Sequence, residues 1–120
     1  MKNLVFSKQI VKKEKLAPKE KRLVIEVCKK NIFTKIKGNK LPADSSLIKI
    51  YATTVEGARR IVLLFDEEIK ASYFLFFRKK DDLIGKNVSI KNPEFKKELH
   101  KYLDILDSDI EENMFEIIEL

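Results

Sequence analysis

The chain has few of the residues on which most enzyme active sites depend. Its 120 residues include one cysteine, one histidine, three glycines and no tryptophan. A single cysteine excludes an internal disulfide and a zinc site built from several cysteines, and a single histidine excludes a two-histidine acid–base pair. The glycines lie far apart, and the carboxylates lack the spacing of metal-binding motifs. Most metalloenzymes and nucleotide-binding folds are therefore excluded, and we expect no metal and no cofactor.

Long apolar runs are also missing. No stretch approaches the ~20 apolar residues that cross a bilayer, and the first residues, "MKNLVFSKQIVKKEK", are too basic and too short in apolar length for a secretory signal. The lone cysteine, Cys28, fits a reducing compartment. We therefore expect a cytoplasmic protein with no membrane partner. A chain of 120 residues with 44% hydrophobic residues is expected to form one modest core.

Positive charge is unevenly distributed. Residues 1–40 hold 13 Lys or Arg against 3 Asp or Glu, whereas residues 104–120 hold 7 acids and no Lys or Arg. A basic body of this kind attracts polyanions such as nucleic acids. A solvated surface of mixed charge is the alternative interpretation of the same counts.

Hydrophobic periodicity predicts an α+β fold. An N-terminal strand and helix precede a loop rich in Gly, Asn, Pro and Ser, and three successive strands then suggest an antiparallel meander before a final helix. Proline opens both predicted helices, which suits the first turn. The predicted elements are a strand in 3–10, a helix in 18–36, a loop in 37–46, strands in 46–54, 57–66 and 70–80, and a helix from Pro93 to Leu106.

The second and third strands of the meander, "RRIVLLF" and "YFLFF", are continuously apolar, so both of their faces should be covered. We expect one helical layer on one face and the acidic tail, a partner or a second copy on the other. The tail, residues 107–120, contains too many apolar residues to be wholly disordered. We therefore divide the chain into a domain over 1–106 and an acidic amphipathic extension over 107–120.

Cationic side chains stand at the ends of two neighbouring strands. One strand opens with an arginine pair, and the next closes with "RKK". In an antiparallel hairpin that turns near "DEEIK", the start of the first strand lies beside the end of the second. Solvated strand ends whose lysines prevent edge pairing are the alternative. The functional hypothesis is one convergent anion-binding patch comprising Arg59, Arg60, Arg78, Lys79 and Lys80.

The order of "LIKIYA", "GARRIVLLFD", "YFLFFRKKD" and the final amphipathic helix resembles the RelE/ParE superfamily, the toxins of type II toxin–antitoxin pairs. The family's "KIR"-like, "GxRxxY"-like and "FxKK"-like elements have counterparts in "IKI", "GARRIV" and "FFRKK". The resemblance covers residues 1 to about 106, the first half by pattern only. Tyr51 stands where the family often has an arginine, and the acidic segment after Leu106 is longer than in a minimal member.

This resemblance implies an N-terminal strand and helices on a small curved antiparallel sheet, with a C-terminal helix. It also implies a metal-independent endoribonuclease of the RelE and HigB kind, which cleaves messenger RNA, with the ribosome as the expected place, by driving a 2′-hydroxyl onto the adjacent phosphorus. The implied partners are mRNA, the ribosome and a cognate antitoxin, through which the chain can form an oligomer.

By the same resemblance an arginine of "GARRIV" holds the scissile phosphate, the "RKK" cations stabilise the transition state, and Lys49 is a candidate base. A lone helical histidine and a helical tyrosine are more often ordinary surface and core residues, which is the alternative for His100 and Tyr102. The candidate catalytic residues are Arg59, Arg60, Lys79, Lys49 and His100, and the candidate RNA- and phosphate-binding residues are Arg78, Lys80, Tyr51 and Tyr102.

Two other functions remain open on the sequence. A ParE-like inhibitor of DNA gyrase has the same fold and leaves RNA whole, and a basic binding module has no catalytic activity. The acidic tail adds a separate hypothesis, because its acidic and apolar composition suits an imitation of an antitoxin in cis. An accessory segment that completes the core is the alternative for the tail.

Overall fold

The computed structural model describes residues 1–38 and 40–120. Asn39, in the predicted loop, lies outside the described residues. The chain forms an α+β fold, as the hydrophobic pattern predicts. The elements in order are β1 (Asn3–Ser7), α1 (Lys8–Lys13), α2 (Pro18–Lys29), β2 (Thr34–Ile36), β3 (Ser45–Thr54), β4 (Gly57–Asp66), β5 (Ala71–Lys79), α3 (Pro93–Glu111) and β6 (Phe115–Glu119).

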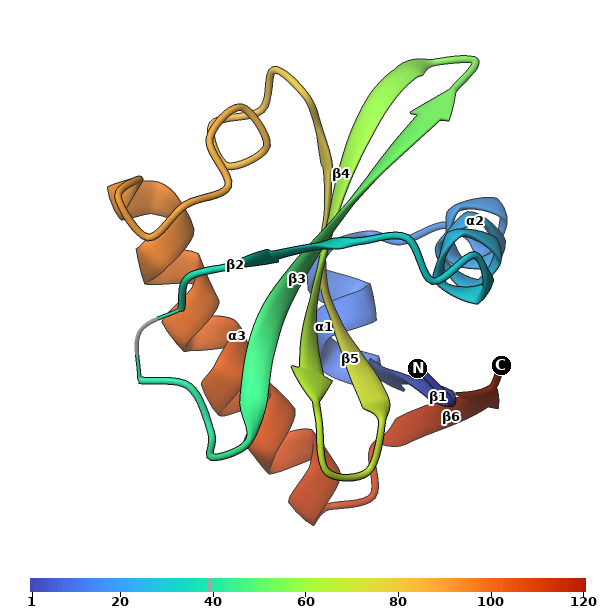
Figure 1. Cartoon of the computed structure of the whole chain (residues 1–120), viewed down its shortest axis with the longest axis vertical. Coiled ribbons are helices and arrows are strands. Elements are labelled where there is room, and N and C mark those ends of the chain that lie inside the picture. Colours follow the sequence, from blue (N-terminus) through green and yellow to red (C-terminus); the bar gives the residue numbers. More distant parts are fainter. Residues whose placement is uncertain (39) are drawn as a thin grey trace.

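The strands form one sheet in the order β2-β3-β4-β5-β1-β6 (Figure 1). The predicted meander is confirmed, because β3, β4 and β5 pair antiparallel in sequence order. The strand β1 lies parallel to β5, and β6 pairs antiparallel with β1. The strand β1 therefore lies between the meander and the C-terminal strand β6. Both chain ends consequently lie on the same side of the sheet.

Helices cover both faces of the sheet. In Figure 1 the helix α2 lies on one side of the strands and α3 on the other, and α1 packs against α3 and β1. We call these the α2 face and the α3 face. The expectation that a tail, a partner or a second copy must cover one face was wrong for this reason: the chain supplies two helical layers.

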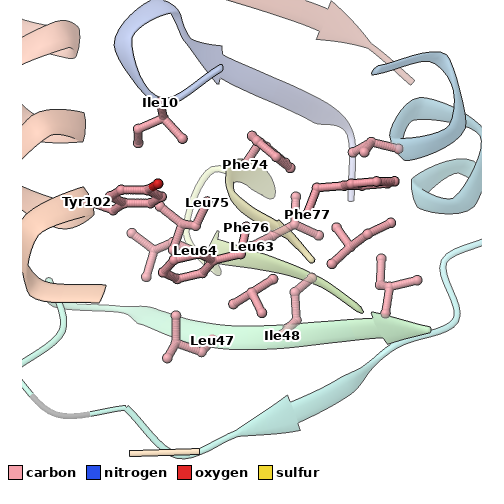
Figure 2. Packing of buried hydrophobic residues seen from close by; sticks show 14 of the residues in the cluster. Ile10, Leu47, Ile48, Leu63, Leu64, Phe74, Leu75, Phe76, Phe77 and Tyr102 are labelled. Atoms are coloured by element: carbon pink, nitrogen blue, oxygen red, sulfur yellow. The ribbon is translucent and has the colours of Figure 1, made fainter. Parts of the chain in front are cut away.

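Strands with apolar side chains on both faces fit a sheet that is covered by helices on both faces. On the α3 face, Phe76 stacks on Tyr102 with ring centroids 4.8 Å apart and contacts Phe95 at 5.5 Å. Phe77, the next residue, points toward α2, and Figure 2 shows Phe77 and Tyr102 on opposite sides of the strands. A register shift between Val62 and Leu63 marks a bulge within the β4–β5 pair. Aromatic residues therefore fill both layers of one continuous core.

Two element boundaries differ from the prediction near the N-terminus. The strand β1 ends at Ser7, whose hydroxyl accepts a hydrogen bond from the backbone N–H of Ile10 at 3.3 Å and caps α1. A serine at this position is a favoured helix start, which the strand prediction over 3–10 missed. The helix predicted over 18–36 ends at Lys29, because Asn31 adopts a positive φ of 55° and the chain then enters β2.

The predicted division after Leu106 falls inside a helix. Residues 107–111 continue α3, and residues 115–119 form β6 on the outer side of β1. Asp109 in this segment is fully buried and accepts hydrogen bonds from the side chains of Ser7 and Gln9. The extension is therefore built into the same sheet and core as the rest of the chain. Among the described residues, no helix is both long and apolar enough to cross a membrane.

Candidate functional site

The β4–β5 register brings the predicted cations together and also separates them into two groups. Arg59 lies opposite Lys79, and Arg60 lies opposite Arg78. The predicted convergence is confirmed in this respect. Successive residues of a strand point to opposite faces, however, so each register pair belongs to a different face. The prediction of one common patch was wrong, because two adjacent arginines in a strand cannot serve the same face.

The α3 face carries a compact group that we call the Tyr51 cluster, which consists of Lys49, Tyr51 and Arg60. Lys49 and Tyr51 lie two residues apart on β3, and Tyr51 is the register partner of Arg60 on β4. The ammonium of Lys49 lies 4.9 Å from the centroid of the Tyr51 ring, and the guanidinium carbon of Arg60 lies 4.1 Å from it. These contacts are cation–π interactions. The aromatic ring thus holds two cations close together.

The Tyr51 cluster is open to solvent and rich in positive charge. Tyr51 is 58% exposed. Among the described residues, neither Lys49 nor Arg60 forms an ion pair with a carboxylate. Two cations without a counter-charge on a rigid pair of strands attract an anion, and phosphate is well suited to an arginine.

The cations alter the acidity of the phenol they surround. The Lys49 ammonium, as a hydrogen-bond donor and then as a positive charge, lowers the pKa of Tyr51, and the charge of Arg60 acts in the same direction. Burial raises the pKa of Tyr73. Burial and the carboxylate of Glu14 raise the pKa of Tyr102. Tyr51 is therefore the tyrosine that ionises first.

Arg78 lies on the same face as the Tyr51 cluster, on the next strand, but two carboxylates compensate its positive charge. Its Nε and Nη2 atoms donate hydrogen bonds to Glu14 at 3.0 and 2.8 Å, and Nη1 lies 3.4 Å from Asp82. The Glu14 side chain is 1% exposed. A bidentate pair of this kind fixes the guanidinium in place. The arrangement therefore gives Arg78 a structural role, and its phosphate-binding role stays a prediction.

The two helical candidates do not join the Tyr51 cluster. Tyr102 is buried, and its hydroxyl donates a hydrogen bond to Glu14 at 2.6 Å. This position matches the alternative that Tyr102 belongs to the core. His100 is partly exposed on α3, and its side chain makes no hydrogen bond or ion pair within residues 1–38 and 40–120.

The α2 face carries the other register pair. Arg59 is 8% exposed, whereas Lys79 and Lys80 are exposed. The backbone N–H of Lys80 donates to the carbonyl oxygen of Ala58 at 3.2 Å, so the "RKK" end stays joined to β4. These three cations line a groove of about 500 Å³ together with Glu56. They are separated from the Tyr51 cluster by the thickness of the sheet.

Glu14 is the functional neighbour that reasoning from the sequence missed. It is the single acid among the first 19 residues, between lysines in "VKKEKL". It accepts hydrogen bonds from Arg78, Tyr102 and the backbone N–H of Phe77. A lone acid in a basic segment with apolar neighbours is a signal for a buried ion pair, although the sequence does not identify its partner.

The arrangement suits anion binding more than metal chemistry. In the part of the chain that the structure describes, no group of three or more His, Cys, Asp and Glu side chains is placed to hold a metal ion. The Tyr51 cluster combines two uncompensated cations with an ionisable phenol, which are the groups needed to hold a phosphate and to accept a proton.

Comparisons with known proteins do not identify a family. No family model matches the chain, and no curated protein or solved structure matches it.

Proposed function

We propose that the chain is the toxin of a toxin–antitoxin pair and a metal-independent endoribonuclease whose active centre is the Tyr51 cluster. The observation that carries this proposal is the placement of Lys49 and Arg60 against the ring of one exposed tyrosine, whose pKa they lower. The resemblance to the RelE/ParE superfamily supports it. The order of strand, helices, antiparallel meander and C-terminal helix agrees with what that resemblance implies.

The reaction proposed is attack of a ribose 2′-oxygen on the adjacent phosphorus. A bond forms between the 2′-oxygen and phosphorus, and the bond from phosphorus to the 5′-oxygen of the next nucleotide breaks. The products are a 2′,3′-cyclic phosphate and a 5′-hydroxyl. The 2′-hydroxyl must lose a proton, the 5′-oxygen must gain one, and extra negative charge develops on the phosphorane. Groups that hold the phosphate and stabilise this charge supply much of the catalysis.

Each member of the Tyr51 cluster suits one of these tasks. Arg60 can hold two phosphate oxygens at once through its planar fork of N–H groups. Lys49 adds a second positive charge and keeps the phenol acidic. Tyr51 accepts the 2′-hydroxyl proton when it is ionised. We assign the role of proton acceptor to Tyr51, because the two cations lower its pKa, and the role of supporting cation to Lys49.

The substrate and partners follow from the resemblance. We propose mRNA as the substrate, with the ribosome as the place of cleavage, and a cognate antitoxin as the inhibitor. The Tyr51 cluster lies at the β3–β4 hairpin, which projects from the body of the molecule in Figure 1. A projecting hairpin can enter a narrow site on a large particle more easily than a flat face.

The test is a cell-free translation reaction to which the protein is added, with cleavage mapped by primer extension. We expect cuts at specific mRNA positions with the native sequence. Arg60→Met should reduce cleavage by about 100-fold or more, because a transition-state charge contact is lost. Lys97→Gln, an exposed change on α3 with an equal loss of charge, should leave cleavage unchanged.

The outcomes separate the candidate functions. Intact mRNA in the presence of the native protein would contradict the nuclease proposal. If DNA breaks appear together with gyrase while RNA stays whole, the gyrase-inhibitor function holds instead. If neither nucleic acid is cut and binding falls steeply with salt, the chain is a binding module.

A further inference from the structure

Arg59 is a buried cation without a counter-charge. It lies on the α2 face, opposite Lys79, and is 8% exposed. The one hydrogen bond of its side chain among the described residues runs from Nη1 to the carbonyl oxygen of its neighbour Ala58, at 3.2 Å. A guanidinium has five N–H donors, and this hydrogen bond uses one of them. The fold therefore leaves most of the binding capacity of Arg59 unused.

Of the carboxylates that line surface grooves together with Arg59, Glu20 and Glu56 are engaged elsewhere, and the exposed Asp81 forms no ion pair with it. Glu56 forms an ion pair with Lys19 at 2.8 Å. Glu20 accepts a hydrogen bond from the backbone N–H of Ala17 at 2.9 Å and so closes the first turn of α2. No ion pair joins Arg59 to an acid anywhere in the described chain. An anion from outside the chain would supply the missing partner.

The guanidinium can be reached from solvent through two grooves. The first, of about 490 Å³, lies between the start of α2 and the β3–β4 hairpin, and the second is the groove that also contains Lys79 and Lys80. Among the described residues, the one buried polar side-chain atom without a partner is Ser46 Oγ. The unbonded nitrogens of Arg59 are therefore not sealed in the core, and they face the grooves.

The wall of the first groove is mainly apolar. Its apolar side chains come from α2, from the hairpin and from β5, namely Ala17, Leu23, Val55 and Phe77. Its charged lining residues besides Arg59 are Glu20, Glu56 and Lys19, and Lys19 neutralises Glu56, so the groove offers no row of cations for the repeated phosphates of an RNA strand. A single carboxylate beside a bulky apolar side chain fits both the wall and the guanidinium.

The acidic tail of the same chain does not fill this groove. It forms β6 at the edge of the sheet beyond β1, and its Glu116 pairs with Lys21. The groove instead borders β3 and β4, on the other side of β5. An occupant must therefore come from another molecule.

We propose that the groove around Arg59 is a docking site for a segment of a partner protein in which an Asp or Glu stands beside a bulky apolar residue. The carboxylate pairs with Arg59, and the apolar side chain packs between Leu23 and Phe77. An ion pair that loses its contact with water when the segment binds gives one strong anchor in the centre of a small interface. The site is separate from the Tyr51 cluster, so its occupant need not compete directly with a ligand on the α3 face.

The test selects ligands for the groove from random peptides displayed on phage. Selection on the native protein, with removal of phage that bind Arg59→Met, should enrich peptides with an acid next to Leu, Ile or Phe. Synthetic copies should bind Arg59→Met about 30-fold or more weakly than the native protein. Arg60→Met is the matched control on the other face and should leave peptide binding unchanged. Chemical shifts of Leu23 and Phe77 should change on binding.

A second variant tests the proposal even if Arg59→Met fails to fold. Val55 is 98% exposed at the groove, so Val55→Glu leaves the core intact and should also weaken the selected peptides by repulsion. Peptides without acid enrichment, equal binding by Arg59→Met, or shifts confined to other surfaces would overturn the proposal. If single-stranded RNA displaces the peptides, and this displacement needs Arg59, the groove is a nucleic-acid site and the peptide proposal fails.

Discussion

Glu14 and Arg78 form a bidentate ion pair that joins the end of α1 to β5, with N–O distances of 3.0 and 2.8 Å. The same carboxylate also accepts hydrogen bonds from the backbone N–H of Phe77 and from the hydroxyl of Tyr102. One buried acid thus links a helix, a central strand and the C-terminal helix beside the Tyr51 cluster. Glu14 holds Arg78 next to Arg60. It also neutralises the charge of Arg78, so Arg78 does not compete with Arg60 for an anionic ligand.

Glu14→Gln should destabilise the fold strongly. The change removes a buried carboxylate and leaves the guanidinium of Arg78 poorly compensated, so we expect a loss of about 3 kcal/mol in the free energy of unfolding. Urea denaturation measures it. Glu98→Gln removes a partly exposed partner of Lys101 on α3 and should cost less than about 0.5 kcal/mol. Equal effects of the two changes would show that the Glu14 network does not stabilise the protein.

Asp109→Asn should destabilise the protein near neutral pH by about 2 kcal/mol, because the hydrogen bonds from Ser7 and Gln9 then meet a neutral group. Burial opposes ionisation, but these hydrogen bonds outweigh it and lower the pKa of Asp109. A carboxyl group with a depressed pKa adds stability above its unfolded pKa, about 3.9, and that stability disappears as the pH falls through the folded pKa.

The difference between native protein and Asp109→Asn should therefore shrink as the solution becomes acidic. Denaturation midpoints measured across the acid range give this difference. Asp107→Asn, at an exposed position of the same helix, is the control and should show no such gap. A gap that persists at low pH would mean that the charge of Asp109 does not matter to folding.

A chain that ends at Asn113 lacks β6 and should be less stable without gaining activity. The strand β6 covers the outer edge of β1, and its loss exposes an apolar edge that favours self-association. Thermal unfolding and sedimentation measure both effects. Because β6 lies at the opposite side of the sheet from the Tyr51 cluster, RNA affinity should not increase. Increased RNA affinity or toxicity would instead support the hypothesis that the tail imitates an antitoxin in cis.

Lys49→Met should raise the pKa of Tyr51 toward the ordinary value of about 10, because the ammonium that stabilises the phenolate is removed. Ultraviolet absorbance during a pH titration detects the phenolate. Tyr51→Phe should remove the first tyrosine to ionise, since the pKa values of Tyr73 and Tyr102 are raised. If the proposed catalysis holds, the alkaline rise of cleavage rate should move to higher pH in Lys49→Met. An unchanged titration would show that Lys49 does not lower the pKa of Tyr51 and would contradict its assignment as the supporting cation.

The main strands and two long helices could be predicted because their signals are local. The strands over 57–66 and 70–80 were predicted within one residue, since apolar runs bounded by turn residues need no tertiary information. Proline at the first turn likewise marked the starts of α2 and α3. The short strands β2 and β6 were missed, because their pairing depends on which edges of the sheet remain open.

The sequence by itself determined that basic side chains would meet where β4 begins and β5 ends, because an antiparallel hairpin requires it. Only the tertiary structure decided which cations share a face. The two-residue repeat of a strand sends Arg59 toward α2 and Arg60 toward Tyr51, and a distant acid, Glu14, compensates Arg78. Burial and pairing between segments far apart in the chain are properties of packing. Because of them, the cations predicted to form one patch have three different environments: the Tyr51 cluster is open to solvent, Arg78 is paired with Glu14, and Arg59 is buried without an acidic partner among the described residues.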